Sequence, residues 1–156
     1  MLWQNFKGVY EPYNVSRKII GFDTFSGFPS VSSVDKKVKF NELANVGEFA
    51  TTPNYEKYLQ DLMEYHATET HAHHLKRYKV IKGDASKTIK KYLKDNQQTV
   101  IALAYFDVDL YKPTKDCLMA IKPYLTKGSV IGFDEPNLKY FPGETIAMRE
   151  AFGSIK

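Results

Sequence analysis

The chain has 156 residues, a length typical of one domain, and 43% of them are hydrophobic, which is enough for a buried core. A single cysteine, Cys117, excludes an internal disulfide and a cysteine-based zinc site, and no apolar run approaches the roughly 20 residues of a membrane span. The net charge of +4 comes from scattered lysines, which argues against nucleic-acid binding and favours a small anionic ligand. The N-terminus has no apolar signal segment, so we expect a cytoplasmic protein.

Predicted strands and helices alternate along the chain. Apolar, β-branched runs predict strands at 17–22, 77–81, 100–106 and 129–133. A long loop at 24–52 follows the first predicted strand. Helical spacing of apolar residues then predicts helices from 52 to about 71, at 86–95, from 113 to about 125 and at 143–152. This order predicts an α/β fold, a mostly parallel sheet with helices on both faces.

Local signals suggest where some helices begin and end. Thr52 and Pro53 are typical of an N-cap and a first helical residue. Pro123 predicts a distorted last turn in the helix that starts near Pro113, and Gly128 predicts its end.

Two acidic pairs follow two of the predicted strands. The 100–106 run is so apolar that it predicts a strand buried on both faces, and it leads to Asp107 and Asp109, which would share a face in extended chain. Asp134 and Glu135 follow the 129–133 strand. The carboxyl ends of parallel strands form the ligand-binding edge, and clustered carboxylates suit Mg²⁺ or Ca²⁺. Spacing alone leaves an even choice between a metal site and ordinary helix-capping or loop acids.

Two further positions lie at predicted strand ends. Asp23 suits the two hydroxyls of a ribose, although it is equally compatible with a simple turn. Gly83, Asp84 and Ala85 follow the 77–81 strand, where glycine permits close backbone approach to a ligand and Asp84 could accept an amine. A turn with a helix cap is the competing interpretation of Asp84.

These motifs together resemble a known family. The chain contains, in order, RKIIGFDTFSGFP, IKGDA, IALAYFDVDLYKPTKDCL, GFDEPN and FPGET. The set resembles the macrocin O-methyltransferase-like family, class I S-adenosylmethionine-dependent enzymes that methylate hydroxyls of sugars and related natural products. The resemblance extends from about residue 11 to residue 153 and implies a Rossmann-like sheet.

The resemblance implies roles for the strand-end residues. Asp23 corresponds to the acid that binds the cofactor ribose, and Gly83, Asp84 and Ala85 correspond to the loop beside the adenine. Asp107, Asp134 and Glu135 correspond to ligands of Mg²⁺. Asp109 is the second acid of the same motif and would either assist the metal or accept the substrate proton.

The implied reaction is direct attack of a substrate hydroxyl on the sulfonium methyl. Mg²⁺ would hold the hydroxyl and lower its pKa, so that a nearby carboxylate could take the proton. The expected partner is a small hydroxyl-bearing molecule. We expect no binding to nucleic acid or to a membrane, and the sequence leaves open whether the chain forms a homo-oligomer.

The chain departs from the family pattern at both ends. The family sheet begins with a central strand and a glycine-rich turn, whereas MLWQNFKGVYEPYN resembles the end of the helix that follows them. An antiparallel pair of strands usually ends the sheet, and it is also lacking. We therefore expect residues 1–156 to form a single partial methyltransferase domain. A sheet without its middle strand leaves backbone groups unpaired, so we expect weak cofactor binding or none.

Two other functions fit parts of the pattern. An Asp-x-Asp motif after an apolar strand also holds metal-bound nucleotides, as in a metal-dependent nucleotide-sugar glycosyltransferase. A non-catalytic, truncated module completed by a partner chain would explain the lacking strand.

Overall fold

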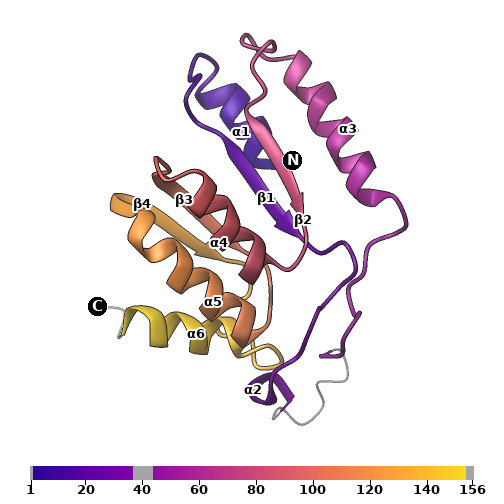
Figure 1. The fold of residues 1–156 in the computed structure, drawn as a ribbon, viewed down its shortest axis with the longest axis vertical. Helices are drawn as coiled ribbons and strands as arrows, with labels where there is room; N and C mark the ends of the chain where they lie inside the picture. Colours follow the sequence, from indigo (N-terminus) through magenta and orange to yellow (C-terminus); the bar gives the residue numbers. More distant parts are fainter. Residues whose placement is uncertain (1, 37–43, 154–156) are drawn as a thin grey trace.

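The computed structural model describes residues 2–36 and 44–153, and its strands and helices alternate along the chain (Figure 1). Part of the predicted 24–52 loop, residues 37–43, lies outside the described residues. In chain order, the described elements are α1 (Leu2–Tyr10), β1 (Ile19–Asp23), α2 (Ser33–Lys36), α3 (Tyr55–Thr68), β2 (Tyr78–Lys82), α4 (Ala85–Asp95), β3 (Ile101–Phe106), α5 (Tyr111–Ile121), the 3₁₀ turn η1 (Lys122–Tyr124), β4 (Leu125–Phe133) and α6 (Gly143–Phe152).

The strands form two separate parallel pairs, β1 with β2 and β3 with β4. Ile19 pairs with Tyr78 at the start of the first pair, and Phe106 pairs with Phe133 at the end of the second. Within its pair, β3 lies on the side nearer to β1 (Figure 1). Among the described residues the sheet is therefore divided between β1 and β3, where the family resemblance placed a further strand.

The main hydrophobic core belongs to the β3–β4 half of the molecule. α4, α5 and α6 pack together there, and Leu118 and Ile121 of α5 are almost completely buried. The apolar sequence of β3 predicted a strand buried on both faces, and this prediction is wrong. Leu103 and Tyr105 are 39% and 46% exposed. The ring of Trp3 in α1 lies 5.6 Å from the ring of Tyr105, but this contact leaves much of that face accessible.

Two predicted boundaries need correction. α3 begins at Tyr55 after Asn54, whose φ of 65° is left-handed, so Thr52 does not cap the helix. Gly128 does not end α5 but lies inside β4 with a φ of 93°, because that strand starts earlier than predicted, at Leu125. The distortion predicted at Pro123 is confirmed as η1.

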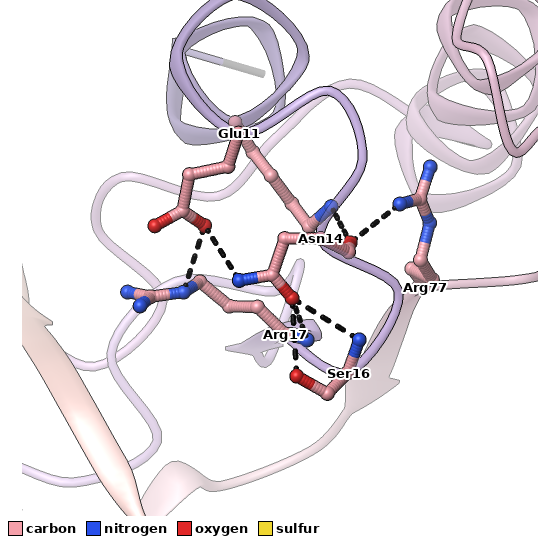
Figure 2. A network of polar contacts seen from close by, with 6 residues as sticks. Glu11, Asn14, Ser16, Arg17 and Arg77 are labelled. Carbon is pink, nitrogen blue, oxygen red and sulfur yellow. Dashed lines mark hydrogen bonds and ion pairs between the residues drawn. The ribbon is translucent and has the colours of Figure 1, made fainter.

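A polar network joins the end of α1 to the first strand pair (Figure 2). The Oδ1 of Asn14 accepts hydrogen bonds from the backbone N–H groups of Ser16 and Arg17, at 3.1 and 3.0 Å. Arg77, just before β2, donates to the backbone oxygen of Asn14 at 2.7 Å, and Arg17 pairs with Glu11 at 2.9 Å. These contacts hold the connection between α1 and β1 against the start of β2. Within the part of the chain that the structure describes, no helix combines the length and apolarity needed to cross a membrane.

Candidate active site

The two acidic pairs lie side by side where β3 and β4 end. Phe106 and Phe133 are paired neighbours, and the backbone N–H of Asp134 donates to the carbonyl oxygen of Phe106 at 2.9 Å. The parallel pairing therefore brings together Asp107, Asp109, Asp134 and Glu135, which we call the acidic rim.

Burial, reinforced by the neighbouring negative charges, raises the pKa of two carboxyl groups of the acidic rim, Asp107 and Asp109. Loss of hydration, followed by the charges of Asp134 and Asp23, raises the pKa of Asp107. Burial, followed chiefly by the charges of Glu135 and Asp107, raises the pKa of Asp109 to about 7. The influence of Asp23 on Asp107 indicates that the end of β1 faces the same region.

The loop after β3 has an unusual backbone conformation. The spacing of Asp107 and Asp109 predicted that they share one face of a strand. This prediction is wrong, because β3 ends at Phe106 and both residues lie beyond it. Asp109 has a φ of 57°, in the left-handed region that aspartate tolerates better than most residues. This turn places Asp109 close to the charge of Glu135.

Two buried carboxylates on other elements hold this loop. The Oε1 of Glu144, near the start of α6, accepts hydrogen bonds from the backbone N–H groups of Val108 and Asp109 at 3.1 and 3.3 Å. Asp35 in α2 accepts one from the backbone N–H of Tyr111 at 2.9 Å. Glu144 and Asp35 are both only 1% exposed.

Close backbone packing explains the glycine before Glu144. A Cβ at Gly143 would lie 2.3 Å from the backbone nitrogen of Tyr111 and 2.6 Å from Oδ1 of Asp35. In the sequence, Gly143 and Glu144 predict only a helix start. The signal that could have indicated a further role for Glu144 is an acidic residue in the first turn of a helix that follows directly after an acidic loop.

Tyr105 is a second residue that sequence reasoning missed. Its hydroxyl donates a hydrogen bond to Oδ1 of Asp134 across the β3–β4 pair. This hydrogen bond is the main reason that the pKa of Tyr105 is raised to about 12. Tyr105 thus orients one carboxylate of the acidic rim.

The residues predicted to bind the cofactor lie together at the carboxyl ends of β1 and β2. The backbone N–H of Gly83 donates to the carbonyl oxygen of Asp23 at 2.8 Å, so the two loops are adjacent. Asp23 is exposed, and its Oδ1 accepts a hydrogen bond from the backbone N–H of Phe25 at 2.7 Å. Gly83 has a φ of 135°, a conformation that strongly favours glycine.

Asp84 acts as the N-cap of α4, which begins at Ala85. Its Oδ1 accepts hydrogen bonds from the backbone N–H and the hydroxyl of Ser86, at 3.0 and 2.6 Å. Although burial opposes ionisation, the hydrogen bonds from Ser86 and then the contact with Lys87 lower the pKa of Asp84. The capping interpretation of Asp84 is therefore correct, whether or not it also contacts a ligand.

The acidic rim does not form a complete metal site in this arrangement. Its donors are the carboxylate oxygens that hard cations prefer, and their repulsion would be relieved by a cation. Among residues 2–36 and 44–153, however, no three His, Cys, Asp or Glu side chains are placed to hold a metal ion. The metal role of Asp107, Asp134 and Glu135 therefore stays a prediction.

A small cleft lies elsewhere, at the opposite ends of β1 and β2. It is lined by residues of α1, α3, the first residues of these two strands and the segments that connect them, among them Gln4, Lys7, Ile19 and Arg77. None of its lining residues belongs to the acidic rim or to the predicted cofactor loops.

Comparison with known proteins gives a clear structural match. No family model and no curated protein matches the chain. Among solved structures, it is similar to CalS11, described as a calicheamicin methyltransferase, with 48% identity and a TM-score of 0.91 over 97% of this chain and 58% of that one. The apo structure of CalS11, described as a TDP-rhamnose 3'-O-methyltransferase in calicheamicin biosynthesis, matches at 41% identity and a TM-score of 0.79, over 97% of this chain and 56% of that one. The chain therefore spans little more than half of these structures, and it has the Rossmann-like fold of these methyltransferases.

Proposed function

We propose that the chain forms part of an S-adenosylmethionine-dependent O-methyltransferase that acts on a sugar hydroxyl. The observation that carries the proposal is the match to CalS11 along 97% of the chain at 48% identity. The acidic rim supports the proposal, because its carboxylates can accept the hydrogen bond of a substrate hydroxyl and lie at the strand ends where α/β folds bind their ligands.

The β1 and β2 ends are the proposed cofactor side. The Oδ2 of Asp23 would accept the ribose hydroxyls, since Oδ1 already accepts the backbone N–H of Phe25. The left-handed backbone at Gly83 lets the chain approach the adenine, beside Asp84 and Ala85. S-adenosylmethionine, when bound, supplies the electrophilic methyl group.

The acidic rim is the proposed acceptor side. Asp109 would hold the acceptor hydroxyl and take its proton as the oxygen bonds to the methyl carbon and the carbon–sulfur bond breaks. A pKa of about 7 suits a general base at neutral pH. Holding the oxygen in line with the methyl group would supply much of the remaining rate enhancement.

Mg²⁺ stays a prediction, with Asp107, Asp134 and Glu135 as its ligands. Because no three acids are placed as a ligand set among the described residues, the proposed proton transfer does not depend on the metal. Calorimetric titration of Mg²⁺ into the protein tests it: binding that the Asp134→Asn variant loses would support the site, and no heat of binding would contradict it.

Product analysis tests the reaction. The protein, extended at its N-terminus by a strand and a glycine-rich turn, is incubated with methyl-labelled S-adenosylmethionine and TDP-rhamnose, the sugar named for CalS11. We expect a singly methylated sugar nucleotide, and at least a hundredfold slower formation by the Asp109→Asn variant. Cleavage of the sugar from its nucleotide without methylation would instead favour a glycosyltransferase.

The divided sheet supports a second candidate, a module that needs completion by further chain. β1 and β3 are not paired with each other among the described residues. We expect S-adenosylhomocysteine to bind the 156 residues at least tenfold more weakly than it binds the extended version. Micromolar binding by the 156 residues alone would contradict this candidate.

A further inference from the structure

The N-terminus of α5 lacks a capping side chain of its own. Its N-cap residue is Leu110, whose apolar side chain cannot accept a hydrogen bond, although the first backbone N–H groups of a helix have no acceptor within it. Asp35 supplies an acceptor from 76 positions earlier in the chain, because its Oδ1 binds the backbone N–H of Tyr111 at 2.9 Å. A carboxylate is favoured at this end, where the helix dipole is positive. Asp35 thus caps α5 from another part of the chain.

The side chain of Asp35 is itself held in place. Figure 1 shows α2, which carries Asp35, beside the starts of α5 and α6. The side chain is 1% exposed, and its Oδ2 accepts a hydrogen bond from the hydroxyl of Ser32 at 2.5 Å. A Cβ at Gly143 would lie 2.6 Å from Oδ1, so glycine is needed to leave room for this carboxylate. Both oxygens have a hydrogen-bond donor, which compensates for the hydration lost on burial.

Apolar contacts join the same two parts of the chain. Leu110, directly before Tyr111, is completely buried. It belongs to a hydrophobic cluster with Phe28, Ala44 and Phe141. The first two of these lie between β1 and α3, as Asp35 does, and the third lies between β4 and α6. The chain between β1 and α3 therefore packs on Leu110 and also binds the backbone of the next residue.

These contacts end directly beside Asp109, the proposed general base. Its φ of 57° is left-handed, and a residue other than glycine keeps such a conformation only where its surroundings impose it. On the N-terminal side of the turn, Glu144 accepts hydrogen bonds from the backbone N–H groups of Val108 and Asp109. On the C-terminal side, the next residue is buried and Tyr111 donates to Asp35. The turn is thus held from both sides.

We propose that Asp35 is a positioning residue for Asp109: by capping α5 it fixes the turn that presents the proposed base, and it ties this turn to the chain between β1 and α3. It acts through the backbone of Tyr111, without contacting the substrate. The importance of Asp35 for catalysis rests on the proposed function, but its effect on the backbone turn does not.

Amide hydrogen exchange followed by NMR tests the cap on the 156-residue chain. In Asp35→Ala the backbone N–H of Tyr111 loses its acceptor, so we expect it to exchange at least tenfold faster than in the wild type. The amide of Lys122, bonded to the carbonyl oxygen of Leu118 near the other end of α5, reports whether the helix persists. Lys36→Ala is the matched control, since it truncates an exposed side chain beside Asp35 in α2 and should leave both rates unchanged.

The backbone conformation of Asp109 gives a second readout. A left-handed φ brings the N–H and Hα of one residue close together and so produces a strong NOE between them. We expect this NOE in the wild type and a weaker one in Asp35→Ala. It should be undiminished in Asp35→Asn, whose amide oxygen can still accept from Tyr111. Unchanged exchange at Tyr111 in folded Asp35→Ala, or an unchanged NOE at Asp109 in that variant, would overturn the proposal.

The hydrogen bond can also be detected in the wild type, so the test holds even if Asp35→Ala does not fold. We expect a scalar coupling across the bond, between the amide nitrogen of Tyr111 and the side-chain carboxyl carbon of Asp35. The coupling between Lys122 and Leu118 within α5 shows that the spectrum is sensitive enough. Absence of the Tyr111 coupling from a spectrum that contains the α5 coupling would contradict the cap.

Methyl transfer by the N-terminally extended protein supplies the functional readout. We expect Asp35→Ala to lower kcat at least tenfold. Asp35→Glu should do the same, because Gly143 leaves no room for the added methylene, whereas Asp35→Asn should stay within threefold of wild type. The KM for S-adenosylmethionine should change less than twofold in all three variants, because Asp35 lies against the acceptor-side turn.

The outcomes separate the two proposals. An unchanged kcat in folded Asp35→Ala or Asp35→Glu would overturn the positioning role. Absence of transfer in the wild type would contradict the proposed function, and the NMR measurements would still decide whether Asp35 caps α5 and fixes the turn at Asp109.

Discussion

The two strand pairs differ in how firmly they are built. The β3–β4 pair lies on a core in which Leu118 is completely buried, and the loop after β3 is held by two buried carboxylates, Glu144 and Asp35. No residue of β1 is fully buried, and the same is true of β4, so the difference lies in the helices that pack against the strands. Among the described residues of α1 only Gln4 is buried, and Val9 and Tyr10 are 72% and 78% exposed, whereas α5 buries Cys117, Leu118 and Ile121. The proposed chemistry thus lies on the well-packed half, and the proposed cofactor contacts lie on the more open half.

The largest expected effect comes from the core of the β3–β4 half. Leu118→Ala leaves a cavity in α5 and should lower the free energy of unfolding by about 3 kcal/mol. Ile20→Ala, in partly exposed β1, should cost about 1 kcal/mol, and Met119→Ala, 52% exposed on the same helix as Leu118, less than about 0.5. Urea denaturation measures all three, and equal losses at Leu118 and Ile20 would remove the distinction between the halves.

A pair of glycines sharpens the same comparison. Gly143→Ala forces a Cβ against the backbone of Tyr111 and should lower the free energy of unfolding by about 2 kcal/mol. Gly21→Ala in β1 meets nothing within 4 Å and should change stability by less than about 0.5 kcal/mol. Thermal denaturation measures the stability of the two variants. Equal stability of Gly143→Ala and Gly21→Ala would contradict the close packing at Gly143.

The pH dependence of stability should reveal the crowding of the acidic rim. The folded pKa of Asp109, about 7, exceeds its unfolded value of about 4, so its contribution to stability falls as pH rises between them. Asp109→Asn keeps the left-handed turn and removes this loss. Three pKa units at about 1.4 kcal/mol each set an upper limit of about 4 kcal/mol, and solvent screening of this partly exposed group reduces the expected stabilisation to about 1.4 kcal/mol at pH 8 and to much less at pH 4. Chemical denaturation at both pH values measures it, with Asp61→Asn on the exposed surface of α3 as control. Equal effects at both pH values would contradict the raised pKa.

Asp84 should show the opposite pH response. Its folded pKa is lowered, so its contribution is present above about pH 4 and is lost as the solution is acidified through the folded pKa. Asp84→Ala removes the N-cap of α4 and should cost about 1 kcal/mol at pH 7. Asp84→Asn, which still caps, should cost only a few tenths. Denaturation curves measure the loss of unfolding free energy in both variants. Equal losses in Asp84→Ala and Asp84→Asn would contradict the capping role.

The order of elements and the position of the acidic rim could be predicted because they depend on local patterns. Apolar runs marked the strands, and parallel pairing then placed Asp107 near Asp134. The burial of β3 could not be predicted from its apolar sequence, since exposure depends on what covers Leu103 and Tyr105. The role of Glu144 was equally hidden, because it depends on backbone N–H groups of a loop about 35 positions away in the chain.

Titration calorimetry of S-adenosylhomocysteine into the N-terminally extended protein tests the division between cofactor side and acceptor side most directly. Asp23→Ala should weaken binding at least tenfold, whereas Asp109→Asn should leave it within twofold of wild type. Equal weakening by both variants, or undiminished binding in Asp23→Ala, would contradict the account.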